Sequence, residues 1–207
     1  MNYAGILEDV SRYYSGKLEI HGATPRGVDW NSAESQRLRF QQLLKVCDCR
    51  TPFTINDYGC GYGALADYLR DEGYVFRYYG FDISSKMTAR ARELHSASQV
   101  TFVNEESDLR PADYTVASGI FNVRLETPAI EWERYMLDTL AAINELSLRG
   151  FAFNALTKYS DPELMRQDLY YADPLILFDH CKTKFSRFVS LIHDYPLYEF
   201  TILVRKE

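Results

Sequence analysis

Apolar and polar positions follow two different periods along this chain. After Pro52, short apolar runs that are typical of buried strands are separated by segments with an apolar residue at every third or fourth position, which is typical of helices. Trp132, Met136, Leu140 and Ile143 show the helical period in the longest of these segments. The repeated alternation of strand and helix predicts a parallel sheet covered by helices on both faces.

Glycine, proline and capping residues set the expected limits of these elements. Strands are predicted over residues 53–58, 75–83, 100–103, 113–121 and 151–156. Helices are predicted over 64–72, from a cap at Ser84 or Ser85, and from Thr127 and Pro128 to an end at Gly150.

The two ends of the chain depart from this alternation. The first 46 residues predict two polar helices joined by a loop over 16–30, with the second helix starting at Asn31. Near the C-terminus, two short helical pieces open at Asp-Pro pairs, and apolar strands follow at 185–192 and 198–206. Because the link between these strands is too short for a parallel crossover, the last strand should run antiparallel to its predecessor.

The segment "DYGCGYG", which starts at Asp57, joins a predicted strand to a predicted helix. We expect backbone N–H groups to be left without partners at such a turn, next to the positive end of the helix dipole, where a ligand can lie against the main chain. Gly59, Gly61 and Ala64 also fit a dinucleotide-binding pattern, and Asp82 follows about twenty residues later. Asp57 opposes that interpretation, because a carboxylate at the end of a buried strand repels a pyrophosphate and attracts an ammonium group.

Three segments in this order, "DYGCGYG", "FDIS" from Phe81 and "ADYTVASGIF" from Ala112, resemble the motifs of class I S-adenosylmethionine-dependent methyltransferases. The resemblance implies an α/β fold, with a Rossmann-like doubly wound sheet of seven strands that is mostly parallel and has an antiparallel C-terminal strand. It also implies S-adenosyl-L-methionine as cofactor and S-adenosyl-L-homocysteine as product.

The resemblance further implies roles for residues at matching positions. Asp57 and the main chain of Gly59, Cys60 and Gly61 would hold the methionine part of the cofactor. Asp82 would accept hydrogen bonds from the ribose hydroxyls, and Ile83 would pack on the adenine. The remaining expected cofactor contacts are Glu106 and Ser107 at the adenine amino group, and Ser118 and Gly119 beneath the sulfonium.

The methyl acceptor is less well defined by the sequence. After the fourth strand the chain reads "SGIFNVRLE" and lacks the Asn/Asp-Pro-Pro-Tyr string of family members that methylate adenine or glutamine nitrogens. We therefore expect a small-molecule acceptor, acidic or sugar-like, methylated at oxygen or nitrogen. The expected acceptor-binding residues are Tyr14, Trp30, Asn122, Arg124, Tyr159 and Tyr171, and the candidates for a catalytic role are His21, Asn122 and His193.

Composition narrows the class of protein. The 207 residues carry a formal net charge of −6 and no basic run, which argues against nucleic acid as a partner. No apolar run has the length of a membrane helix, no metal site is apparent, and the N-terminus has no secretory pattern, so a cytoplasmic location is expected. The sequence does not indicate the oligomeric state.

The length favours a single domain over 1–207, with an N-terminal helical lid over 1–50 and a Rossmann-like core over 51–207. Two alternatives to an active methyltransferase stay open at this point. One is a nicotinamide-dependent oxidoreductase, and the other is an inactive cofactor-binding partner subunit.

Overall fold

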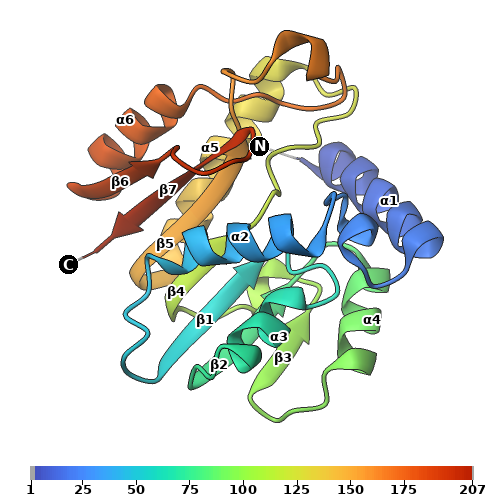
Figure 1. The fold of residues 1–207 in the computed structure, drawn as a ribbon, viewed down its shortest axis with the longest axis vertical. Coiled ribbons are helices and arrows are strands. Elements are labelled where there is room, and N and C mark those ends of the chain that lie inside the picture. The colour runs from blue at the N-terminus through green and yellow to red at the C-terminus, as the bar shows by residue number, and fades with distance from the viewer. Residues whose placement is uncertain (1–2, 207) are drawn as a thin grey trace.

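The computed structural model describes residues 3–206, which form one seven-stranded sheet in the order β3-β2-β1-β4-β5-β7-β6 (Figure 1). The strands are β1 (Phe53–Tyr58), β2 (Phe76–Phe81), β3 (Val100–Val103), β4 (Ala112–Ala117), β5 (Ser147–Leu156), β6 (Phe188–Ile192) and β7 (Glu199–Arg205). The helices are α1 (Ala4–His21), α2 (Ala33–Leu44), α3 (Ala64–Asp71), α4 (Ser85–Leu94), α5 (Ala129–Glu145) and α6 (Pro174–Lys184). Short 3-10 helices are η1 (Pro25–Val28), η2 (Glu106–Asp108) and η3 (Pro162–Leu164).

Strands β1 to β5 pair in parallel, whereas β7 runs antiparallel to both β5 and β6. The strand order reverses between β1 and β4, so the loops that follow these two strands leave the sheet on opposite sides of a crevice. This arrangement confirms the predicted Rossmann-like sheet with an antiparallel C-terminal strand.

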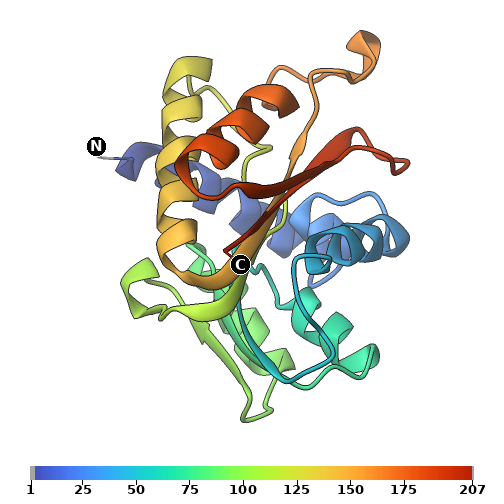
Figure 2. The same cartoon turned by 90° about the vertical axis from the view of Figure 1, so that its left-hand side faces the viewer.

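Two apolar clusters cover the two faces of the sheet, and the alternation of side chains along each strand separates them. In β5, Phe151 and Phe153 pack with α5 and α6 on one face, while Ala152 between them faces α2 and α3. The turned view in Figure 2 shows α5 and α6 on one side of the sheet and α2 and α3 on the other. The layers are helix, sheet and helix, as the alternation along the sequence predicts.

The N-terminal region differs from the sequence prediction in two places. The predicted loop over 16–30 is wrong at its start, because α1 continues to His21 and ends where Gly22 adopts a positive φ of 66°. Asn31 is not the cap of α2. Ser32 is the cap, because its hydroxyl accepts the backbone N–H of Ser35 and the Ser35 hydroxyl accepts that of Ser32.

The long helix α5 also ends earlier than predicted, at Glu145, and Gly150 lies inside β5. A side chain at Gly150 would place its Cβ 2.5 Å from the backbone oxygen of Val204, so glycine permits the close pairing of β5 with β7 and does not end a helix. At the start of α5, Pro128 is the N-cap residue and not the first helical residue. Within residues 3–206, no helix combines the length and apolar character needed to cross a membrane.

Candidate functional site

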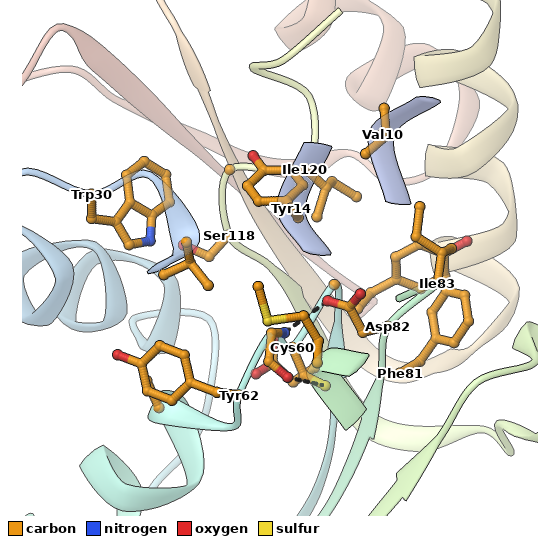
Figure 3. Close-up of a pocket in the computed structure, with 18 of the residues that line it drawn as sticks. Val10, Tyr14, Trp30, Cys60, Tyr62, Phe81, Asp82, Ile83, Ser118 and Ile120 are labelled. Atoms are coloured by element: carbon orange, nitrogen blue, oxygen red, sulfur yellow. Dashed lines mark hydrogen bonds between the residues drawn. The ribbon is translucent and has the colours of Figure 1, made fainter. Parts of the chain in front are cut away.

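A cavity opens at the carboxyl ends of β1, β2 and β4, beneath α1 (Figure 3). Its floor is the loop after β1, its sides are Phe81 to Ile83 and Ser118 to Ile120, and Val10 and Tyr14 of α1 cover it. We call this the first cavity. Its position is the topological switch point of the sheet, where ligands of open α/β folds bind.

The backbone of the glycine loop is tied to the neighbouring strand. The N–H groups of Gly59 and Cys60 both donate to the carbonyl oxygen of Phe81, at 2.7 and 2.9 Å, and that of Gly61 donates to a carboxylate oxygen of Asp82 at 2.8 Å. The prediction that these N–H groups lack partners is therefore wrong. These hydrogen bonds fix the shape of the loop.

Two glycines let side chains of the N-terminal region, those of Val28 and Trp30, approach the main chain of the cavity closely. Gly61 has a φ of +55°, and an added Cβ would lie 2.9 Å from Val28. Gly119 has a φ of +75°, and an added Cβ would lie 2.3 Å from the indole of Trp30. Residues with a side chain rarely adopt such φ values, and an added Cβ would clash with Val28 or Trp30. Both positions therefore favour glycine.

Asp57 is buried at the end of β1 and lines the first cavity. One of its oxygens accepts a hydrogen bond from the Tyr78 hydroxyl at 2.7 Å. Burial raises the pKa of Asp57 to about 7, with a smaller contribution from the Asp82 charge, although the Tyr78 bond opposes the rise. Within residues 3–206, no basic side chain lines this cavity to offset the carboxylate.

Asp82 follows β2 and lines the same cavity. Its two oxygens accept the N–H groups of Gly61 and Ser84, each at 2.8 Å. These bonds lower the pKa but burial outweighs them, and the pKa is raised to about 6. A carboxylate can accept about four hydrogen bonds, so Asp82 keeps acceptor capacity toward a ligand.

Comparisons with known proteins identify the family to which this chain belongs. Residues 55–140 match the family of methyltransferase domains. A Mycobacterium tuberculosis (strain ATCC 25618 / H37Rv) protein whose name places it among the methyltransferases, Rv1506c, is 51% identical over 164 residues, which are 79% of this chain and 99% of the relative. The chain belongs to the class I S-adenosylmethionine-dependent methyltransferases.

Solved structures show the same fold at low sequence identity. Magnesium protoporphyrin IX methyltransferase from Synechocystis PCC 6803, with bound S-adenosylhomocysteine, matches this methyltransferase with a TM-score of 0.67 and 17% identity, over 97% of this chain and 99% of its own. Human N-acetylserotonin methyltransferase with S-adenosylmethionine has a TM-score of 0.67 and 16% identity, over 100% of this chain and 60% of its own. Family membership confirms the predicted enzyme class and its S-adenosylmethionine cofactor.

The methyltransferase has a second cavity next to the first. Tyr14, Val28 and Trp30 line both cavities and form the wall between them. The far side of the second cavity is built from the end of β5, the start of β7 and the segment over 160–171. The two cavities together could hold two ligands that meet at one wall.

The predicted site residues fall into three groups by location. Lining the first cavity are Asp57, Gly59, Cys60, Gly61, Asp82, Ile83, Ser118, Gly119, Tyr14 and Trp30. Asn122 and Tyr171 line the second cavity, together with Tyr14 and Trp30. Outside both linings lie His21, Glu106, Ser107, Arg124, Tyr159 and His193. The roles of all these residues stay predictions.

Several of the outlying residues have partners elsewhere. The guanidinium of Arg124 donates to backbone oxygens, among them those of Thr127 and Gln167 at 2.8 and 2.6 Å, and so holds the segment that follows β4. His193 is exposed and lies against the ring of Tyr159, with 6.0 Å between ring centroids. Glu106 is exposed and outside the lining of the first cavity. Burial, and then the Glu106 carboxylate, raise the pKa of Tyr58, which lines that cavity.

Sequence reasoning missed a buried ion pair of the methyltransferase. Arg39 of α2 and Glu199 of β7 form an ion pair in the wall of the second cavity, with side-chain exposures of 8% and 2%. The sequence feature that could have indicated this pair is Glu199, an acidic residue at the start of the apolar strand "EFTILV". Within residues 3–206, no group of three or more His, Cys, Asp or Glu side chains is placed to hold a metal ion.

Proposed function

We propose that this methyltransferase binds S-adenosylmethionine in the first cavity and transfers its methyl group to an oxygen or nitrogen of a small molecule bound in the second. The observation that carries the proposal is the shared wall of Tyr14, Val28 and Trp30. These three side chains face both cavities, so a molecule in the second cavity lies next to the first. Transfer between the two ligands needs only that this wall admit their reacting atoms.

The residues of the first cavity fit the cofactor. Asp57 would hold the ammonium group, and Asp82 would accept hydrogen bonds from the ribose hydroxyls. Ile83 offers an apolar contact to the adenine, with Glu106 and Ser107 as the proposed partners of its amino group. The hydroxyl oxygen of Ser118 is buried and has no hydrogen-bond partner within residues 3–206, although Ser118 lines the cavity, and this fits a polar group of a ligand beside it.

The cofactor, when bound, supplies a methyl group activated by a positively charged sulfur. The part of the protein is to position the acceptor and to exclude water. The N-terminal segment over 1–50 would act as the lid, because Tyr14, Val28 and Trp30 come from its described part and cover both cavities. Asn122, buried at 5% exposure in the second cavity, is the proposed orienting residue for the acceptor.

Two further observations support a small acceptor. The fold neighbours above are named for magnesium protoporphyrin IX and N-acetylserotonin, which are small molecules. A net charge of −6 disfavours nucleic acid. We also propose a cytoplasmic location, in keeping with the free thiols of Cys47, Cys49, Cys60 and Cys181.

Transfer of a labelled methyl group tests the proposal. The protein is incubated with methyl-labelled S-adenosylmethionine and a cell extract, which is then divided by ultrafiltration. Chromatography of the filtrate separates unreacted S-adenosylmethionine from other small molecules. Transferred label is expected in a small molecule other than the cofactor and not in protein or nucleic acid, and transfer to macromolecules alone would contradict the small acceptor.

Cofactor binding is measured separately by thermal unfolding. S-adenosylhomocysteine at about a hundred times its dissociation constant should stabilise the fold by about 2.7 kcal/mol. For a domain of this size that corresponds to roughly 5–10 °C in Tm. NAD should produce no shift, and a shift with NAD alone would favour the oxidoreductase alternative.

A further inference from the structure

Among residues 3–206, the buried guanidinium of Arg39 in the wall of the second cavity has one nitrogen without a hydrogen-bond partner. Arg39 donates from Nε to both carboxylate oxygens of Glu199 at 2.9 Å, and Nη2 also donates to Glu199. Glu199 accepts a further hydrogen bond from Nδ2 of Asn154 at 2.8 Å. Nη1 of Arg39 is buried and has no hydrogen-bond partner within residues 3–206.

A purely structural role accounts for only part of this arrangement. The bonds from Nε and Nη2 already tie α2 to β7 through Glu199. They leave Nη1 as a buried donor, and a buried donor without an acceptor is costly in a folded protein. Because Arg39 lines the second cavity, a molecule bound there is placed to supply the missing acceptor atom.

Trp30 covers this guanidinium and links it to the first cavity. The centroid of its ring system lies 3.8 Å from Cζ of Arg39, and its indole also lies over Gly119. Figure 3 shows the indole beside Ser118 at the edge of the first cavity. Because Nη1 is buried, an oxygen atom in the second cavity reaches it only if a covering side chain, such as the Trp30 indole, moves aside.

The charged residues around the second cavity determine whether a charged or an uncharged ligand oxygen is favoured there. Its charged lining residues are two acids and two bases, Asp29, Arg39, Arg166 and Glu199. Arg39 is paired with Glu199, and Arg166 lies 3.9 Å from Asp29 and also pairs with Asp168. An ionised acceptor would find no uncompensated cation, so an uncharged oxygen is favoured over a carboxylate.

Much of the remaining lining is apolar or aromatic, including Val123, Leu156, Leu169 and Tyr171. We propose that Nη1 of Arg39 donates a hydrogen bond to an uncharged carbonyl or hydroxyl oxygen of an acceptor molecule that is apolar in part. This inference rests on the proposed function, because it takes the second cavity as the acceptor site. It replaces the broader expectation of an acidic or sugar-like acceptor with an uncharged one.

Binding of two matched probes, benzamide and benzoate, tests the inference. They share a ring and differ in charge, and each is titrated calorimetrically into protein saturated with S-adenosylhomocysteine. Benzamide should bind the wild type at least threefold more tightly than benzoate. Arg39→Lys, which keeps the charge opposite Glu199 but removes the guanidinium fork, should weaken benzamide binding at least tenfold.

Arg37→Lys is the matched control, because Arg37 lies on the same helix with an exposed side chain paired to Glu72. It should leave benzamide binding unchanged. Three results would each overturn the inference. The wild type could bind benzoate more tightly than benzamide, it could fail to bind benzamide, or Arg39→Lys could bind benzamide as tightly as the wild type does. A crystal of the wild type with benzamide gives a readout independent of variant folding, with its oxygen expected within about 3.2 Å of Nη1.

Binding of S-adenosylhomocysteine separates this inference from the proposed function. If the wild type binds S-adenosylhomocysteine and the benzamide results differ from those expected, the role of Arg39 is wrong and the methyltransferase proposal stands. If the wild type fails to bind S-adenosylhomocysteine, the proposed function itself fails. Arg39→Lys should retain its affinity for S-adenosylhomocysteine within twofold, which also shows that the variant is folded.

Discussion

The two cavities differ in how their charges are balanced. Among the residues that the structure describes, 3–206, the first is lined by two carboxylates, Asp57 and Asp82, and by no basic side chain. Their hydrogen bonds come from a tyrosine hydroxyl and backbone N–H groups, and burial raises the pKa of both. In the second cavity, Glu199 is held by Arg39, and Asp29 by Lys17 at 2.7 Å.

This difference indicates what each cavity accepts. A cavity with two uncompensated carboxylates favours a ligand that carries positive charge, and S-adenosylmethionine has both an ammonium and a sulfonium group. A cavity whose acids are already paired gives no such preference and selects by shape and hydrogen bonds. A diphosphate would meet repulsion in the first cavity and no free cation in the second, which argues against a dinucleotide in either.

The largest expected effect comes from removing a carboxylate of the first cavity. Asp82→Ala should weaken S-adenosylhomocysteine binding by about a hundredfold or more, because it removes hydrogen bonds to a charged group worth about 1.5–3 kcal/mol each. Calorimetric titration measures the loss. Asp71→Ala, at an exposed acid of α3, is the control and should bind normally. A loss below threefold in Asp82→Ala would mean that the ribose contact is misassigned.

A change in the wall between the cavities should have the next largest effect. Gly119→Ala places a methyl group at a position with φ of +75° and within 2.3 Å of the Trp30 indole. We expect the free energy of unfolding to fall by about 1–3 kcal/mol, measured by denaturant unfolding. Gly16→Ala is the control, because no atom lies within 4 Å of an added Cβ in α1, and it should not destabilise the protein. If the two variants are equally stable, the Trp30 indole can move away from Gly119 without a measurable loss of stability.

The charge of the first cavity can be tested by pH without any mutation. Because the pKa of Asp57 is raised to about 7, its carboxyl gains a proton as pH falls through 7 and then no longer attracts an ammonium group. The affinity for S-adenosylhomocysteine should therefore fall as pH decreases below 7, by up to about tenfold per pH unit.

Methylthioadenosine serves as the matched ligand for this pH test, because it keeps the adenosine and lacks the amino-acid tail. Any contribution from Asp82 is common to both ligands, so only S-adenosylhomocysteine should show the additional dependence on Asp57. Asp57→Asn should remove the difference between the two pH profiles. If the affinities of both ligands for the wild type depend on pH in the same way, Asp57 does not bind the ammonium group.

The sequence predicted the first cavity far better than the second. Asp57 lies at the end of β1, the glycines follow that strand, and Asp82 follows β2. Parallel pairing of these neighbouring strands brings the residues together. Arg39 and Glu199 are 160 residues apart, and only the packing of α2 against the end of the sheet joins them. No local period or motif carries that information.

The errors in local structure have similar causes. The N–H groups of Gly59 and Cys60 have no partner within their own segment, but the carbonyl oxygen that accepts them, from Phe81, belongs to the next strand. The sequence predicts a loop from Gly16, yet α1 continues through it. A helix can accommodate one glycine at a cost of about 1 kcal/mol when contacts such as Lys17 to Asp29 follow it.

The smallest expected effect tests the charge pairing around the second cavity. Asp29 has a positive φ of 63° and accepts hydrogen bonds from the Tyr13 hydroxyl and from Nζ of Lys17, each at 2.7 Å. Asp29→Asn keeps a residue that tolerates this backbone conformation but removes the charge opposite Lys17. We expect a loss of about 1 kcal/mol in the free energy of unfolding.

Asp9→Asn provides the comparison for this small effect, because the Asp9–Arg12 pair on α1 is exposed at 55% and 68%, whereas Asp29 and Lys17 are exposed at 20% and 26%. The exposed pair should contribute almost nothing, since water screens it. Raising the salt concentration should shrink the Asp29→Asn loss only partly. If both variants unfold at the same denaturant concentration as the wild type, the second cavity is not held by paired charges, and its contrast with the first cavity no longer stands.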